Sequence, residues 1–110
     1  MKAPEHFSAD MQTWWRSLSR RYPFGPQHFR VLQCACEAWD EKATADALTR
    51  DEGLLVTNRF GEKKAHPAVA IARDARIAFI RAVRELSLAD DDLPGETPRP
   101  PRLKHYKGRK

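Results

Sequence analysis

Residues Ala47–Leu88, ALTRDEGLLVTNRFGEKKAHPAVAIARDARIAFIRAVRELSL, decide the fold of this 110-residue chain. Gly53 is expected to close the helix before it, because glycine can take the left-handed conformation that ends helices. A short apolar run then leads into a turn at Asn58–Gly61, and we expect a loop or small β-hairpin laid against the helices. Pro67 suits a first helical turn, where its missing N–H costs nothing, so a long helix is predicted from there to about Leu86.

Two further helices are expected upstream of this stretch, which makes the predicted fold mainly all-α. Ser8 is a suitable N-cap for a first helix that Pro23 stops, whereas residues 1–7 are expected to be frayed. A second helix, opened by Pro26, is predicted to run to Arg50 or Asp51. The apolar face of the first helix is Met11, Trp14, Trp15, Leu18 and Tyr22. The seam of the second is Phe29, Leu32, Cys36, Trp39, Ala43 and Ala47.

The last helix carries apolar residues on two sides. An inner arc is predicted for Ile71, Ala75, Ala78, Phe79, Ala82, Val83 and Leu86. The other side mixes arginines with branched apolar residues, although the outward face of a surface helix is ordinarily polar. Either a second copy covers this side, or the N-terminal helix or the tail does. We predict a homo-oligomer, ring-like in form, with interface residues Val69, Arg73, Arg76, Ile77, Ile80 and Arg84.

The excess basic charge lies at the C-terminal end. The chain has 20 Lys and Arg residues against 15 Asp and Glu, a net charge of +5. Six of the basic residues and no acidic residue fall within residues 97–110, so the rest of the chain is close to neutral. Four prolines from Pro94 to Pro101 disfavour a helix there. We therefore divide the chain into a helical domain, residues 1–93, and a flexible, Pro-rich basic tail, residues 94–110.

Basic residues at two places are candidate nucleic-acid contacts. Each phosphate that a Lys or Arg neutralises releases counterions, so a basic tail can give salt-dependent, sequence-independent affinity. Docking to a protein partner is the alternative for the tail, and a solvated tip is the alternative for the basic turn around Glu62. The candidates are Arg99, Arg102, Lys104, Lys107, Arg109 and Lys110 in the tail, and Arg59, Lys63 and Lys64 in the turn.

No pattern in the chain predicts catalysis, a cofactor or a metal site. The four histidines have no metal-ligand spacing with one another or with Cys and carboxylates, and no glycine-rich phosphate loop is present. Cys34 and Cys36 point to different faces of a helix, so they cannot share a disulfide or a metal ion there. Cysteine is a common small core residue, and we interpret both in that way. No apolar run reaches membrane-spanning length, and the first residues do not form a secretory signal. We expect a non-enzymatic protein of the cytoplasm.

The order of features from Ala47 to about Leu88 resembles the small terminase subunit of tailed double-stranded DNA phages, in its compact helical family. The matching features are a helix end near Leu48, Gly53-Leu54-Leu55-Val56, a turn at Gly61, His66-Pro67-Ala68 and the closing Arg84-Glu85-Leu86-Ser87-Leu88. The family commonly has a proline soon after this Leu-x-Leu. Here Asp90–Asp92 come between it and Pro94.

This resemblance implies a DNA-packaging component without enzymatic activity. Such subunits assemble as rings, bind double-stranded viral DNA in the host cytoplasm, and recruit or regulate the large terminase subunit, an ATPase and nuclease.

Two other functions remain open from the sequence. One is a small helical transcriptional regulator with a helix-turn-helix. The connection between the second and third helices, about 15 residues, is much longer than the 3–4-residue turn of that motif. A pairing across Pro23–Gly25, with the Pro26 helix as reader, has a suitable length. The tail alone would also permit an RNA-associated protein.

Overall fold

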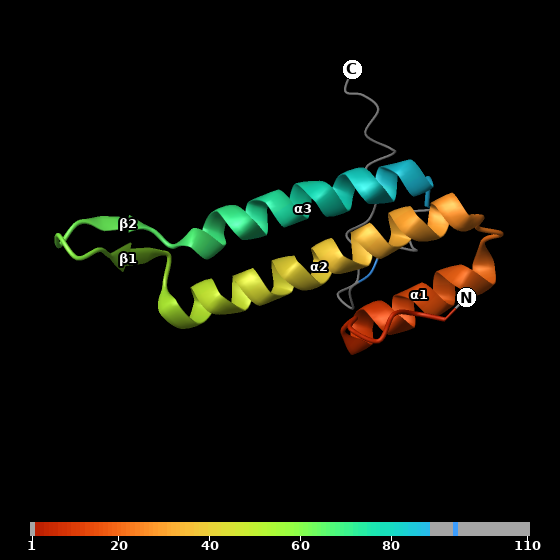
Figure 1. The fold of residues 1–110 in the computed structure, drawn as a ribbon, viewed down its shortest axis with the longest axis horizontal. Helices are drawn as coiled ribbons and strands as arrows, with labels where there is room; N and C mark the ends of the chain where they lie inside the picture. Colours follow the sequence, from red (N-terminus) through yellow and green to blue (C-terminus); the bar gives the residue numbers. More distant parts are fainter. Residues whose placement is uncertain (1, 89–93, 95–110) are drawn as a thin grey trace, which may run out of the picture.

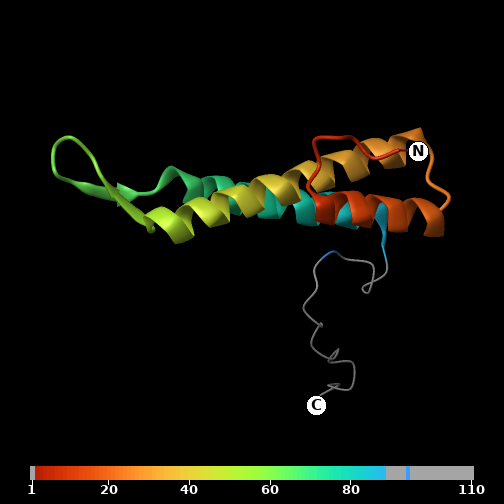
Figure 2. The same cartoon turned by 90° about the horizontal axis from the view of Figure 1, so that it is seen from below.

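The computed structural model describes residues 2–88 and Pro94, which form three helices and one β-hairpin (Figures 1 and 2). This confirms the mainly helical class and the predicted order of elements. The tail candidates and Asp90–Asp92 lie outside the described residues. The elements are α1 (Ala9–Arg21), α2 (Pro26–Glu52), β1 (Leu55–Thr57), β2 (Lys63–Ala65) and α3 (Pro67–Leu86).

The helices begin and end at residues that the sequence marks. The Ser8 side chain accepts a hydrogen bond from the Met11 N–H at 3.2 Å and so caps α1, as predicted. Pro67 lies in the first turn of α3. Gly53 ends α2 with φ +88°, a conformation that favours glycine, and its N–H donates to the Thr49 carbonyl at 2.8 Å.

Helices α2 and α3 run side by side in opposite directions (Figure 1). Near the hairpin their contact consists of small residues, with Ala45, Ala68 and Ala72 in one buried cluster. Toward the other end the side chains become large, and the Phe79 ring lies 5.0 Å from the Trp39 ring. Alanines let the two backbones approach closely, and the aromatic end joins this pair to the rest of the core.

Helix α1 packs on α2 and supplies most of the aromatic core. Trp15 is 2% exposed and its ring lies 5.3 Å from Phe29, while Trp14 lies 5.8 Å from Phe79 of α3. Burying one such aromatic side chain contributes about 1.5–3 kcal/mol. The predicted apolar face of α1 is therefore confirmed. The views in Figures 1 and 2 show α1 running beside α2 in the opposite direction, as in an αα-hairpin.

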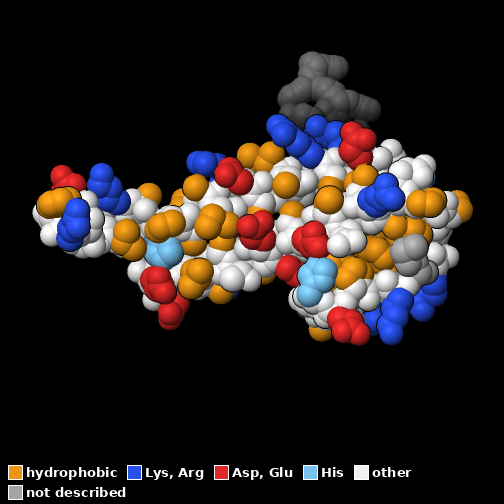
Figure 3. Space-filling model, in the orientation of Figure 1, with side chains coloured by type: hydrophobic (Ala, Val, Ile, Leu, Met, Phe, Trp, Pro, Cys, Tyr) orange, Lys and Arg blue, Asp and Glu red, His pale blue; other side chains and the backbone are white. Residues whose placement is uncertain are grey.

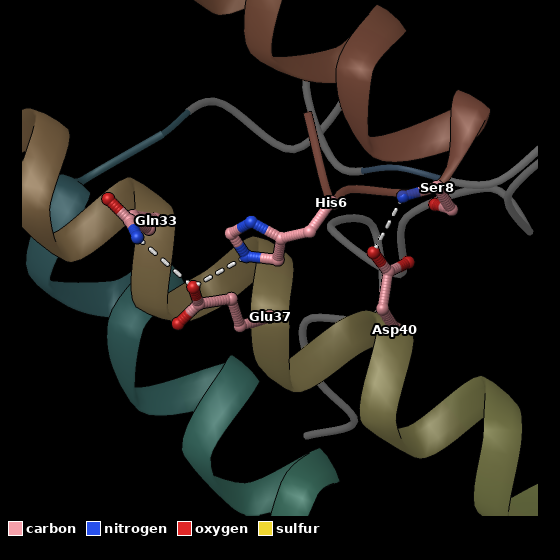
Figure 4. Close-up of polar contacts among 5 residues, drawn as sticks. All are labelled: His6, Ser8, Gln33, Glu37 and Asp40. Carbon is pink, nitrogen blue, oxygen red and sulfur yellow. Dashed lines mark hydrogen bonds and ion pairs between the residues drawn. The ribbon is translucent and has the colours of Figure 1, made fainter. Parts of the chain in front are cut away.

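The segment before α1 is an ordered arm, so the expectation of frayed residues is wrong for residues 3–7. Phe7 is 4% exposed and meets the Trp15 ring edge-on at 5.7 Å. His6 Nε2 lies 2.8 Å from Glu37 Oε2, and the Ser8 N–H donates to Asp40 Oδ2 at 2.9 Å (Figure 4). Hydrogen bonds from Gln33 and His6 lower the pKa of Glu37. Apolar burial and carboxylate acceptors on α2 thus hold an arm that has no helical periodicity.

Several residues predicted to lie inside are exposed. Helix α1 is only half as long as α2, so the predicted seam ends beyond Trp39, and Ala43 and Ala47 are exposed. On α3, Ile71 and Ala78 lie beside the buried stripe instead of on it.

The two cysteines have different surroundings. Cys36 is fully buried, as predicted, and burial together with Asp40 and Glu37 raises the pKa of its thiol to about 12. Cys34 is exposed, so its interpretation as a core residue is wrong. Two positions apart on a helix, only one of them can face α1.

Replacing Phe7 with alanine tests whether the arm is part of the core. Large-to-small substitutions of buried phenylalanine cost about 3–5 kcal/mol, so Phe7→Ala should lower the free energy of unfolding by about 3 kcal/mol. Urea unfolding at fixed protein concentration measures this. Phe60→Ala is the matched control, since Phe60 is 72% exposed and its removal should change stability by less than about 0.5 kcal/mol. Equal effects of the two substitutions would contradict a packed arm.

Candidate nucleic-acid and assembly surfaces

The hairpin between α2 and α3 is short and closed by its own polar contacts. Its two strands are antiparallel, with Leu55 opposite Ala65 and Thr57 opposite Lys63. The Asn58 side-chain oxygen accepts hydrogen bonds from the N–H groups of Phe60, at 2.8 Å, and Glu62, at 3.0 Å. Gly61 has φ +82° in the turn, so a side chain there would be strained. These contacts define the shape of the tip.

The hairpin projects past the ends of α2 and α3 (Figure 1), so the expectation that it would lie against the helices is wrong. Its apolar residues are too few to form a core of their own, and Leu54, Leu55 and Phe60 are 65%, 57% and 72% exposed. The three basic residues predicted here are all exposed on this projection: Arg59, Lys63 and Lys64.

Charge on the hairpin is predominantly positive. The Arg59 guanidinium lies over the Phe60 ring, 5.0 Å from its centroid, which positions a cation next to an exposed aromatic surface. Glu62 is the acid among these residues, with its Oε1 atom 4.0 Å from Lys64 Nζ. Both side chains of this ion pair are more than 60% exposed, so it leaves Lys64 available to a phosphate.

His66 connects the hairpin to both helices. Its Nδ1 accepts a hydrogen bond from the Ala68 N–H at 3.0 Å and so caps α3, while its Nε2 lies 2.7 Å from Glu52 Oε1 at the end of α2. Because Nδ1 is an acceptor, the proton of the neutral ring is on Nε2 and points to Glu52. The backbone N–H of His66 donates to the Leu54 carbonyl at 2.7 Å. His66 is 8% exposed, so the hairpin has a fixed base.

The sequence marked His66-Pro67 as a helix start but did not reveal that the imidazole itself is the cap. A histidine directly before a first-turn proline was the available signal, because the N-cap residue supplies the acceptor for the free N–H groups of that turn.

The six predicted interface residues lie together on one side of α3, next to its buried stripe. Val69 is half-buried, and the other five are exposed: Arg73, Arg76, Ile77, Ile80 and Arg84. Ile77 and Ile80 are 43% and 47% exposed, so helix α1 does not cover this side. An exposed apolar surface mixed with arginines is typical of interface composition.

The charge of Arg76 acts on Asp46 of α2, so the part of α2 around Asp46 adjoins this side of α3. A hydrogen bond from Lys42 lowers the pKa of Asp46, and the charges of Lys42, Arg76 and Arg50 lower it further. Arg76 therefore lies on the same flank of the pair as Asp46 and Arg50. Arg73 makes a 3.4 Å contact with Asp74, in which both side chains are over 60% exposed.

Within the described part of the chain, no group of three or more His, Cys, Asp or Glu residues is arranged to hold a metal ion. The described helices also include none that is long and apolar enough to span a membrane.

The described residues define a small helical protein with a projecting basic hairpin and a side of α3 that the other described elements leave exposed. A family model described as "Phage terminase, small subunit" matches residues 12–91, which include most of α1, all of α2, the hairpin and α3. The chain belongs to this family, whose role is DNA packaging in bacteriophages. The match begins well before Ala47, where the resemblance in the sequence starts. No curated protein and no solved structure gives a significant match.

Substitution of His66 separates its capping role from its contact with Glu52. His66→Ala removes the acceptor of the Ala68 N–H and should lower the free energy of unfolding by about 1 kcal/mol. His66→Asn supplies a carboxamide oxygen at the N-cap and should restore most of that stability. Urea unfolding of both variants, with the exposed substitution Lys64→Ala as control, provides the measurement. If the Asn variant is as unstable as the Ala variant, the Glu52 contact accounts for the effect instead.

Proposed function

We propose that this chain is a non-enzymatic, homo-oligomeric component of the phage packaging machinery that binds viral double-stranded DNA. In this role it recognises the DNA in the host cytoplasm and recruits or regulates the large terminase subunit, which supplies the ATPase and nuclease activities. The family match over all three helices and the hairpin is the observation that carries this proposal.

The basic hairpin supports the DNA-binding part of the proposal. Arg59, Lys63 and Lys64 are exposed on a projection with a fixed base, and the hairpin is a two-stranded ribbon, a form that fits the major groove. Phosphate contacts from such residues give affinity without sequence preference. The tail, residues 97–110, adds six basic residues and is proposed to contact DNA or the large subunit.

The exposed side of α3 supports the homo-oligomeric part. A branched apolar side chain stabilises an assembly when a partner removes it from water, at about 25 cal/mol per Å² buried. Ile77 and Ile80 are nearly half exposed although they lie on a helix whose opposite side is buried against α2. We propose that Val69, Arg73, Arg76, Ile77, Ile80 and Arg84 form a subunit contact.

DNA binding is tested by removing charge at the two proposed contact regions. One variant combines Arg59→Gln, Lys63→Gln and Lys64→Gln, and the other lacks residues 97–110. Each should bind duplex DNA more weakly, and the slope of log affinity against log salt should fall by about 0.9 for each phosphate that the variant no longer neutralises. Fluorescence anisotropy over a salt series measures both quantities.

The matched control removes the same charge from the opposite end of the molecule. It combines Arg16→Gln, Arg20→Gln and Arg30→Gln, all exposed positions on α1 and the start of α2. Its affinity and salt slope should stay close to those of the parent protein. Weaker binding in this variant alone would contradict the proposal and would favour a reader helix at the start of α2.

A further inference from the structure

The α2–α3 pair has two flanks, one on each side of its buried seam. On α3 the seam is Ala68, Ala72, Ala75, Phe79 and Leu86. An α-helix turns by about 100° per residue, so residues on either side of this stripe point to opposite flanks. The two flanks differ in charge, and each exposes apolar side chains.

One flank is basic, and we call it the Arg76 flank. It comprises the α3 side described above, with Val69, Arg73, Arg76, Ile77, Ile80 and Arg84. Asp46 belongs to the same flank, but Lys42 Nζ already contacts its Oδ2 atom at 2.8 Å. The arginines Arg50 and Arg76 thus exceed the local acidic charge. Ile77 and Ile80 provide the exposed apolar surface.

The opposite flank carries the exposed carboxylates of Glu41 and Asp74 beside Leu48 and Ile71, and we call it the Leu48 flank. Asp74 Oδ1 also contacts Arg73 Nε at 3.4 Å, but with both side chains over 60% exposed this contact leaves the carboxylate accessible. Helical spacing places Glu41 and Leu48 seven residues apart on one side of α2, and Ile71 and Asp74 three residues apart on one side of α3. Leu48 and Ile71 are 42% and 44% exposed. Figure 3 shows one broad face of the molecule, with acidic side chains where α2 and α3 adjoin, apolar ones toward the hairpin, and Lys or Arg side chains along the edge of α3.

We propose that the Arg76 flank of one copy docks on the Leu48 flank of the next copy, head to tail. This inference rests on the homo-oligomer of the proposed function and assigns its two contacting surfaces. Each flank offers two large exposed apolar side chains, and the carboxylates of one match the guanidinium groups of the other. A flank placed against its own kind would oppose like charges, which is unfavourable at an interface. An interface between two different surfaces repeats from copy to copy and can close into a ring.

Mixing two variants distinguishes this arrangement from a two-fold one. The first variant, Leu48→Arg with Ile71→Arg, disrupts the Leu48 flank. The second, Ile77→Glu with Ile80→Glu, disrupts the basic flank. At concentrations where the parent chain is assembled, each variant alone should be monomeric by native mass spectrometry. An equimolar mixture should form complexes containing both chains, because one retains an intact Arg76 flank and the other an intact Leu48 flank.

A variant that keeps the parent assembly on its own would overturn the head-to-tail contact, since its altered flank would then lie outside the interface. If the parent chain assembles but the mixture of variants does not associate, the head-to-tail contact would also be overturned, although the homo-oligomer would stand. A monomeric parent would instead refute the homo-oligomer itself. Circular dichroism verifies the folding of each variant.

A charge-only pair keeps the test decisive if either apolar variant fails to fold. It consists of Glu41→Lys with Asp74→Lys, and Arg73→Glu with Arg76→Glu, and the same mixing result is expected. Thr13→Arg, at an exposed position of α1, is the control and should leave the parent assembly unchanged.

Discussion

The close packing of α3 against α2 through small side chains is the contact on which the rest of this structure depends. Ala45, Ala68 and Ala72 bury each other where the helices leave the hairpin. Alanine loses no side-chain entropy on burial, but it also buries little apolar area. The pair therefore relies on the aromatic end, where Trp39 and Phe79 meet, for much of its stability. A narrow seam also leaves the flanks of both helices in solvent.

The exposed flanks of α2 and α3 are the surfaces through which this packing could serve the function of the family. The helices α2 and α3 contact each other through small side chains, so much of their surface stays exposed to solvent. A domain of this size has few other residues with which to bury that surface. Helix α1 and the N-terminal arm cover one part of α2, and the exposed isoleucines of α3 remain. Assembly of copies would bury them, and it would also place several basic hairpins close together. Phosphate contacts that are weak singly would then act on one DNA molecule together.

Much of this fold could be predicted from the sequence, because its helix ends are encoded locally. Ser8, Gly53 and Pro67 each act within one turn of their own position. Contacts between distant segments could not be predicted in this way. The arm shows no periodicity, so the partners of Phe7 could not be inferred. The predicted apolar arc of α3 is broader than the stripe that α2 can bury. The packing of the two helices decides which part of the arc is buried, and it leaves Ile71 exposed.

The functional surfaces were predictable to different degrees. The basic character of Arg59, Lys63 and Lys64 was evident, but their projection from the helices follows from the absence of enough apolar residues in the hairpin to hold it down. The two-sided character of α3 was evident from the arginines and isoleucines that share its outer side. The Leu48 flank could not be predicted, because it combines residues from two helices whose spatial order the sequence does not specify.

The mass of the full chain in solution tests the central claim most directly. Light scattering coupled to size-exclusion chromatography at micromolar concentration gives this mass without reference to shape. A homo-oligomeric packing component should give a defined multiple of 12.6 kDa. A single species at 12.6 kDa across the concentration range would contradict the assembly role assigned to α3.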